Sequence, residues 1–85
     1  MPRTKHPPLQ RALGSVIRRH RERLKLSQED CADKVGIHRT YQGAVERGER
    51  NITLANIARI ARAFSLSPSS LLSEAEAVLK TSSGR

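Results

Sequence analysis

A chain of 85 residues with 36% hydrophobic side chains can form one core, because a second core would have too few residues to bury. Aromatic residues make up only 2% of the sequence, so this core must be aliphatic. No apolar run is long enough to span a membrane or to form a signal peptide, and we therefore expect a cytoplasmic protein with no membrane partner. The single cysteine, Cys31, excludes an internal disulfide.

The positive charge is concentrated near the start of the chain. Residues 1–25 contain eight basic residues and one acidic residue, which gives +7 of the formal net charge of +8. Such a basic block is typical of proteins that bind nucleic acid, although membranes and acidic proteins also attract basic surfaces. Charge alone is therefore weak evidence for any one partner.

An arm and a helix are expected first. Residues 1–8 hold three prolines and no hydrophobic periodicity, so they are predicted to form a disordered basic arm. Pro8 suits the start of a helix, which should run from Leu9 to Leu24 with apolar residues at helical spacing. His20 lies on that apolar face and is expected to be a hydrogen-bonded core residue, because the other two histidines stand at no metal-ligand spacing from it. The sequence supports no metal site and no cofactor.

A second helix is predicted to begin at Ser27. Ser27 followed three residues later by Asp30 resembles a capping box, in which the serine side chain bonds to the backbone three residues on. Cys31 falls on the apolar face of this helix, so we expect a small core residue and not a reactive thiol. Gly36 ends the helix, because glycine adopts the left-handed conformation without a Cβ clash.

A third helix is predicted from about His38 to Arg47. With the preceding helix it forms a candidate helix-turn-helix over about residues 27–47, because two short helices joined by a glycine-containing turn are typical of DNA-reading proteins. Most of its outward side chains can form hydrogen bonds, whereas an ordinary surface helix carries mainly Glu and Lys. An ordinary helical hairpin is the weaker alternative, because motif and charge agree. The outward residues are His38, Arg39, Thr40, Tyr41 and Ala44.

Two further helices are predicted after the motif. Thr53 can cap a fourth helix whose apolar side begins with Leu54, and Ser67-Pro68 gives a cap followed by proline at the start of a fifth. We find no strand pattern and no internal repeat. The chain is therefore expected to be all-α, with a DNA-binding domain over residues 9–79 and a flexible tail over residues 80–85.

The fifth helix is unusually apolar for the end of a small domain. Leu71 is expected to turn inward and close the domain's own core. Leu72, Ala75 and Leu79 are expected to contact a second copy of the chain, because exposed apolar patches on small domains are rarely left uncovered. The alternative is that the whole helix serves a single core.

The string S-Q-E-D-C-A-D-K-V-G-I-H-R-T-Y…V-E-R-G-E-R-N and the five-helix plan resemble the repressor family of the lambdoid phages and its bacterial relatives, the XRE family. Within that family the chain most resembles small regulators such as the controller proteins of restriction–modification systems. The resemblance covers residues 9–79 and is more specific for fold than for biological role. It implies a five-helix, lambda-repressor-like DNA-binding domain.

That resemblance also implies which residues contact DNA. Base contacts would come from the third helix, and backbone contacts from residues around its ends and from the start of the second helix. The residue types agree, since arginine can bond guanine through O6 and N7 and threonine can meet a base edge or a thymine methyl. The implied base contacts are Arg39, Thr40, Tyr41 and Ala44, and the implied backbone contacts are Gln28, His38, Arg47, Arg50 and Asn51.

The resemblance further implies an internal ion pair. The family pairs an arginine late in the first helix with a glutamate at the end of the recognition helix, and Arg21 and Glu46 occupy those positions. In two places the chain departs from the family, because Cys31 replaces a leucine and Gln42 a branched apolar residue. Gln42 is either buried with hydrogen bonds or exposed by a rotation of its helix, and the adjacent Gly43 weakens that helix by roughly 1 kcal/mol relative to alanine.

The sequence therefore predicts a sequence-specific DNA-binding transcriptional regulator, a homodimer that reads a palindromic operator through the major groove of double-stranded DNA. The alternative is an antitoxin-type or other protein-interaction module that uses the C-terminal helix. An enzyme is not expected, because no paired-carboxylate, Cys/His or Ser/His/Asp arrangement and no phosphate-binding loop is present. RNA binding is disfavoured because Tyr41 and Phe64 are the only aromatic residues available for stacking.

Overall fold

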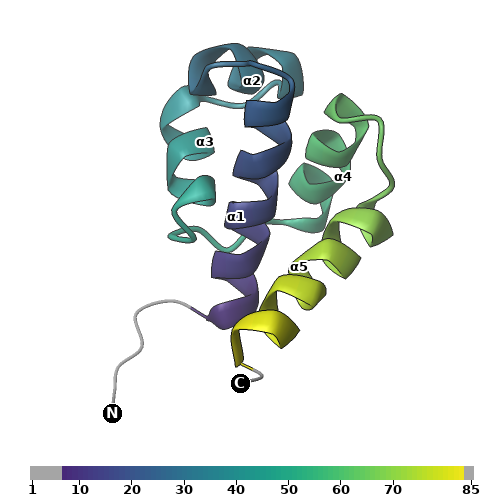
Figure 1. Ribbon diagram of the computed structural model, residues 1–85. Coiled ribbons are helices and arrows are strands. Elements are labelled where there is room, and N and C mark those ends of the chain that lie inside the picture. The colour runs from purple at the N-terminus through teal and green to yellow at the C-terminus, as the bar shows by residue number, and fades with distance from the viewer. Residues whose placement is uncertain (1–6, 84–85) are drawn as a thin grey trace.

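The computed structural model describes residues 7–83, which fold into five α-helices without a strand (Figure 1). The predicted all-α, five-helix architecture is therefore confirmed, and α2 and α3 form the helix-turn-helix. Most of the predicted arm, residues 1–6, and the last two residues of the predicted tail lie outside the described residues. The helices are α1 (Pro8–Arg23), α2 (Gln28–Val35), α3 (Arg39–Glu46), α4 (Leu54–Ala63) and α5 (Pro68–Ser83).

Local signals place the helix ends. The side chains of Ser27, Thr53 and Ser67 each accept a hydrogen bond from the backbone N–H three residues on, at 3.0, 3.1 and 3.1 Å. These caps satisfy donors that have no partner within the first turn of a helix. Gly36 closes α2 in the left-handed conformation, at φ 92°, as its position in the sequence predicts.

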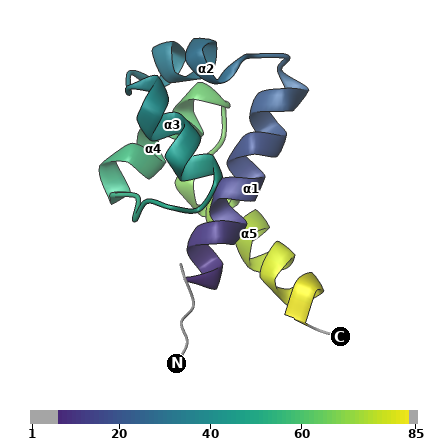
Figure 2. The same cartoon turned by 90° about the vertical axis from the view of Figure 1, so that its left-hand side faces the viewer.

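The helices form a closed ring around an aliphatic core. α1 packs against α5 and α3, and α4 completes the ring by packing against α2 and α5. Figure 1 shows α1 between α3 on one side and α4 and α5 on the other, and Figure 2 looks onto α3 with α4 behind it. The core includes Leu13, Val16, Ile17, Cys31, Val45, Ile60 and Leu71.

α1 and α3 approach each other closely at Gly14. A Cβ at this position would lie 2.7 Å from the carbonyl oxygen of Glu46 and still closer to that of Val45. Real Cβ atoms do not make contacts this short, so the two helices can pack at this separation only because residue 14 is glycine. The distance of α3 from the core thus depends on the absence of one methyl group.

His20 links α1 to α5. Its side chain is buried, its Nε2 lies 2.8 Å from Glu74 Oε1, and its ring stacks on Phe64 with the centroids 5.4 Å apart. Arg19 donates to the same carboxylate oxygen at 3.2 Å. The expectation of a hydrogen-bonded core histidine is therefore confirmed.

α5 is longer than predicted. It continues to Ser83 instead of ending at Leu79, so the first part of the predicted tail is helical. Within residues 7–83, no helix is both long enough and apolar enough to cross a membrane. The same residues contain no group of three His, Cys, Asp or Glu side chains that could hold a metal ion.

Candidate nucleic-acid interface

α3, the candidate recognition helix, begins at a histidine cap. His38 Nδ1 accepts a hydrogen bond from the backbone N–H of Thr40 at 3.1 Å, which satisfies one of the unpaired donors at the start of the helix. The imidazole is exposed to solvent. With Nδ1 used by the cap, Nε2 is the ring nitrogen that can meet a phosphate at the rim of the helix.

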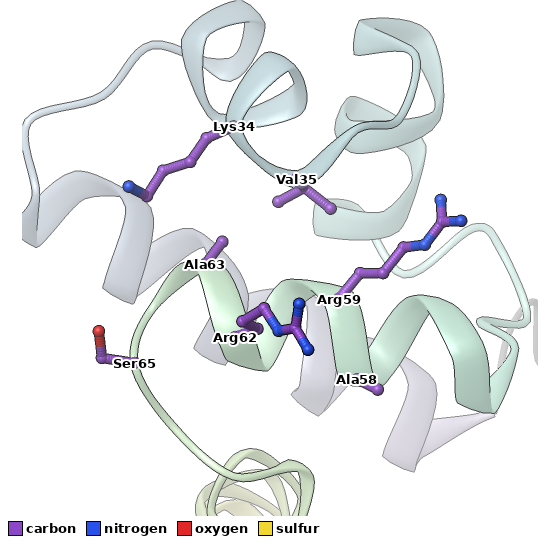
Figure 3. A pocket seen from close by; sticks show the side chains of 7 residues that line it. All are labelled: Lys34, Val35, Ala58, Arg59, Arg62, Ala63 and Ser65. Carbon is purple, nitrogen blue, oxygen red and sulfur yellow. The ribbon is translucent and has the colours of Figure 1, made fainter.

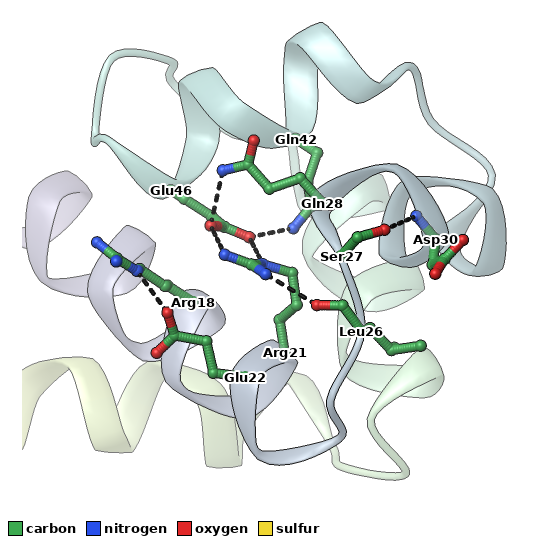
Figure 4. Close-up of polar contacts among 9 residues, drawn as sticks. All are labelled: Arg18, Arg21, Glu22, Leu26, Ser27, Gln28, Asp30, Gln42 and Glu46. Carbon is green, nitrogen blue, oxygen red and sulfur yellow. Dashed lines mark hydrogen bonds and ion pairs between the residues drawn. The ribbon is translucent and has the colours of Figure 1, made fainter.

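A buried carboxylate holds α3 against the two preceding helices (Figure 4). Arg21 of α1 donates to both oxygens of Glu46, from Nε at 2.6 Å and from Nη2 at 2.9 Å. Gln42 donates to the same carboxylate at 2.6 Å, and Gln28 of α2 donates to it at 3.1 Å. Arg21 also donates to the carbonyl oxygen of Leu26 at 2.8 Å. The two residues assigned from the sequence to an ion pair thus join α1, α2 and α3.

The network keeps this carboxylate charged. Burial alone would raise the pKa of Glu46, but hydrogen bonds from Arg21, Gln42 and Gln28 outweigh burial and hold the pKa below its ordinary value. The hydrogen bond to Glu46 in turn raises the pKa of Arg21. Because the Glu46 side chain is only 2% exposed, removing its cationic partner would leave a charge almost shut off from water.

Gln42 is fully buried, which decides between the two alternatives for this position. It is hydrogen-bonded to Glu46, and α3 is not rotated to expose it. Among the described residues, its Oε1 is the only buried side-chain nitrogen or oxygen without a hydrogen-bond partner. The neighbouring Gly43 leaves room for Gln28, since a Cβ there would lie 3.3 Å from the Gln28 Oε1 atom.

An open hollow of about 400 Å³ lies beside α3. Its side chains come from the starts of α2 and α3 and from the end of α3, and most of them can donate hydrogen bonds to base edges or phosphates. Glu29 is the one acidic lining residue, and its Oε1 lies 3.6 Å from Arg39 Nη1. Both side chains of this pair are exposed, so the pair contributes little to stability and opens at little cost. The hollow is lined by Gln28, Glu29, Arg39, Thr40, Gly43 and Arg47.

Two of the predicted base-contact residues lie outside this hollow. Tyr41 and Ala44 are half-buried, and Tyr41 packs against the hydrophobic core. The Tyr41 hydroxyl accepts a hydrogen bond from Asn56 of α4 at 3.2 Å, and the Arg50 guanidinium lies over the tyrosine ring, 5.3 Å from its centroid. Tyr41 therefore contacts α4 and the loop between α3 and α4. Its contact with a base stays a prediction.

The predicted backbone contacts are spread around the ends of α3. Arg47 lies in the hollow and pairs with Glu49 at 3.1 Å. Gln28 also lies there, with its amide held by Glu46. Asn51 is exposed but lines a separate, apolar groove. Only part of the predicted set thus shares one surface, and DNA contact by each member stays a prediction.

Of the three predicted interface residues on α5, Ala75 is wrongly assigned. It is 0% exposed within a single copy of the chain, so it cannot face a second copy. Ala75 follows Leu71 by one helical turn, and both side chains point into the core. Leu72 and Leu79 are half-buried and keep part of their surface exposed.

An apolar groove of about 290 Å³ lies beside Leu72, where α1, the loop after α3 and α5 meet. Leu9 and Ile52 also line it. Leu54, at the start of α4, is 80% exposed, although the periodicity of the sequence places it on the apolar side of that helix. These residues give the molecule more exposed apolar surface than the sequence predicts.

Sequence reasoning missed two residues that shape the interface. Gln10 Nε2 donates to the carbonyl oxygen of Gly48 at 2.9 Å and so fixes the loop after α3 to α1. No local pattern links these residues, which are 38 positions apart in the chain. Glu29 was missed because an acidic residue in a first helical turn is already explained by the helix dipole.

Comparison with known proteins relates the chain to a family. A helix-turn-helix family model, HTH_3, matches residues 17–71, which include all of α2, α3 and α4. The control protein C.SmaI of Serratia marcescens is 45% identical to the chain over 60 residues, which cover 71% of this chain and 71% of that protein.

Two solved structures of restriction–modification controller proteins are also similar. C.AhdI from Aeromonas hydrophila is 40% identical, with a TM-score of 0.70 over 73% of this chain and 94% of that chain. The C.Esp1396I tetramer in complex with its natural 35-base-pair operator is 26% identical, with a TM-score of 0.78 over 87% of this chain and 97% of that chain.

Proposed function

Because the chain belongs to the HTH_3 helix-turn-helix family, we propose that two copies of it bind a two-fold symmetric operator, each with α3 in a major groove. The family consists of DNA-binding transcription regulators, and the chain is one of them and not an enzyme. Within the family it is similar to restriction–modification controller proteins.

The hollow beside α3 is the observation that carries this proposal. It presents Arg39 and Thr40 to solvent on a helix that Glu46 ties to α1 and α2. A reading helix that is already fixed loses little conformational freedom when it enters a groove. Arg39 is suited to guanine and Thr40 to a base edge or a thymine methyl, and we assign Arg47 and Arg50 to phosphate contacts.

Selection of bound duplexes from a random DNA pool tests the reading mode. The wild-type chain should enrich a two-fold symmetric sequence with half-sites about one helical turn apart. Arg39→Ala should weaken operator binding by about 1–3 kcal/mol and relax the preference at one base pair of each half-site. The matched control is Arg23→Ala, which removes an exposed arginine at the end of α1 and should leave the selected sequence unchanged.

The salt dependence of operator affinity is a second test of the proposal. Operator affinity should fall steeply as salt rises, because arginine–phosphate contacts release counterions. A salt-independent affinity, or enrichment of no sequence at all, would contradict the proposal.

The apolar groove and Leu54 support the two-copy part of the proposal. We place the contact between copies on the exposed parts of Leu9, Ile52, Leu54, Leu72 and Leu79, which lie on α1, α4, α5 and the loop before α4. Large apolar side chains left in water on a small domain favour a covering partner. C.Esp1396I binds its operator as more than one copy, which agrees with this arrangement.

Sedimentation equilibrium of the purified chain tests the contact. The wild type should be a dimer, and Leu54→Asp should shift it toward monomer without unfolding it, because this side chain is 80% exposed. Ala55→Asp, on the neighbouring exposed position, is the matched control and should leave the dimer intact. A wild-type monomer would instead favour the antitoxin-type alternative, in which a different protein covers the same apolar surface.

A further inference from the structure

A second hollow, of about 600 Å³, lies between the end of α2 and α4 (Figure 3). None of its lining residues also lines the hollow beside α3. Its apolar part is formed by Val35 and Ala63 together with a further alanine of α4, and three cationic side chains surround it. These cations are Lys34, Arg59 and Arg62. We call this hollow the basic cleft.

Among residues 7–83, no carboxylate forms an ion pair with the cations of the basic cleft. No residue that lines the cleft is acidic, and the ion pairs among the described residues involve other side chains. Arg59 and Arg62 are one turn apart on α4, so their like charges repel each other. This repulsion disfavours folding, and an anionic partner from outside the domain would relieve it.

The cationic groups are spread along the cleft and do not converge on one point. Figure 3 shows the Lys34 ammonium at one end, the Arg59 guanidinium at the other, and Arg62 between them. A single phosphate would need donors that meet at one place. Several carboxylates in a row, with an apolar side chain against Val35 and Ala63, would satisfy both the charges and the apolar floor.

We propose that the basic cleft binds an acidic segment of a partner protein, in which carboxylates flank one or two apolar side chains. DNA suits the cleft less well, because a sugar-phosphate backbone offers no apolar side chain for the floor. The cleft also lies at the C-terminal end of α2, whereas α2 contributes its N-terminal residues to the hollow beside α3. The eight residues of α2 separate these two ends by about 12 Å.

The probe is a fluorescein-labelled helical peptide with glutamates at helical spacing around a central leucine, tested on the full chain. A second peptide carries glutamine in place of each glutamate. The test variant is Arg59→Gln/Arg62→Gln. The matched control, Arg18→Gln/Arg23→Gln, removes the same charge from exposed positions on α1. Circular dichroism establishes that both variants remain helical.

The glutamate peptide should bind the wild type, and the glutamine peptide should not. Fluorescence anisotropy should show about tenfold weaker binding to the cleft variant and no more than about twofold weaker binding to the control variant. Backbone amide shifts on peptide addition should be confined to residues 34–35 and 58–65. Affinity for the selected operator, measured separately, should be equal in the two variants.

Three results would overturn the proposal. Equal loss of peptide binding in both variants would mean that the peptide senses only the overall positive charge. Failure of the glutamate peptide to bind the wild type would exclude an acidic segment as the ligand of the cleft. Operator binding that is weakened about tenfold more in the cleft variant than in the control would make the cleft a DNA-backbone contact. The last result would leave the proposed reading of DNA by α3 intact, so the two proposals can fail independently.

Discussion

At the scale of single residues, Glu46 receives hydrogen bonds from Arg21, Gln28 and Gln42, which lie on three different helices. Taking two charges out of water is costly, so a buried ion pair need not be more stable than apolar residues of the same size. Breaking the pair is a different matter, because the remaining charge keeps its cost and loses its partner. Because the network joins α1 and α2 to α3, we expect it to hold α3 in one orientation.

Arg21→Met should lower the free energy of unfolding by about 3–5 kcal/mol, because it leaves the Glu46 carboxylate buried without its cation. Urea denaturation followed by circular dichroism measures the change. Arg18→Met is the matched control, since Arg18 pairs with Glu22 on the exposed surface of α1, and it should cost less than about 1 kcal/mol. Equal effects of the two substitutions would contradict a buried, energetically coupled pair.

The lowered pKa of Glu46 makes stability depend on pH. Its pKa is lower in the folded than in the unfolded chain, so the unfolded chain binds more protons as acid is added. Stability should be full above the ordinary glutamate pKa of about 4.3 and should fall as the pH drops below it. Glu74 contributes with the same sign, because hydrogen bonds from His20 and Arg19 outweigh burial and lower its pKa.

Urea denaturation at a series of pH values from neutral to acidic measures this dependence. Glu46→Gln should be less stable at neutral pH and should show a shallower loss in acid. Glu76→Gln, at an exposed position of α5, is the control and should follow the wild-type profile. Wild-type stability that stays constant as the pH falls below about 4 would contradict the assignment.

At the scale of helices, the contact between α1 and α3 depends on Gly14. Gly14→Ala should destabilise the fold by about 1–3 kcal/mol, because the new methyl group meets backbone oxygens of α3 that cannot move alone. It should also weaken operator binding, since α3 must shift. Ser15→Ala adds alanine to the exposed face of α1 and should be neutral or slightly stabilising. Thermal unfolding of the two variants measures the difference. Similar melting temperatures would contradict the close approach of α1 and α3 at Gly14.

The helices themselves could be predicted because their signals are local. Ser27, Thr53 and Ser67 each bond to a backbone group three residues away, and such a pattern is readable in the sequence. The rotation of α5 could not be predicted, because Leu72 and Ala75 belong to one continuous apolar stripe. Which of them faces inward is decided by the packing of α5 against α1 and α4.

The candidate site was predictable to a similar degree. The residue types of α3 indicate an interface, and Arg39 and Thr40 share one hollow. The burial of Gln42 could not be read from the sequence, because it also depends on Glu46 and on Arg21 of another helix. Contacts between residues far apart in the chain decide the details that local patterns leave open.

At the scale of the whole molecule, three separate surfaces lie on the five-helix domain. The hollow beside α3 carries hydrogen-bond donors, the basic cleft lies at the far end of α2, and the apolar groove lies where α1, α5 and the loop after α3 meet. No residue is shared among the three, so each surface can be substituted without changing the lining of the other two. Substitutions in the basic cleft should therefore leave dimerisation and operator binding largely intact, whereas substitutions that break the contact between copies should also weaken operator binding.

Because Cys31 is buried, alkylation of its thiol can measure how often α2 opens away from the core. It is the only cysteine of the chain, it has no exposed surface, and burial raises the pKa of its thiol. An alkylating reagent can reach the sulfur only while α2 is displaced from the core, so the labelling rate reports how often this local opening occurs. Labelling should be far slower in buffer than in urea, and slower again when operator DNA is bound. Mass spectrometry of the alkylated wild-type chain would therefore measure the rate of this local opening, and no substitution is needed.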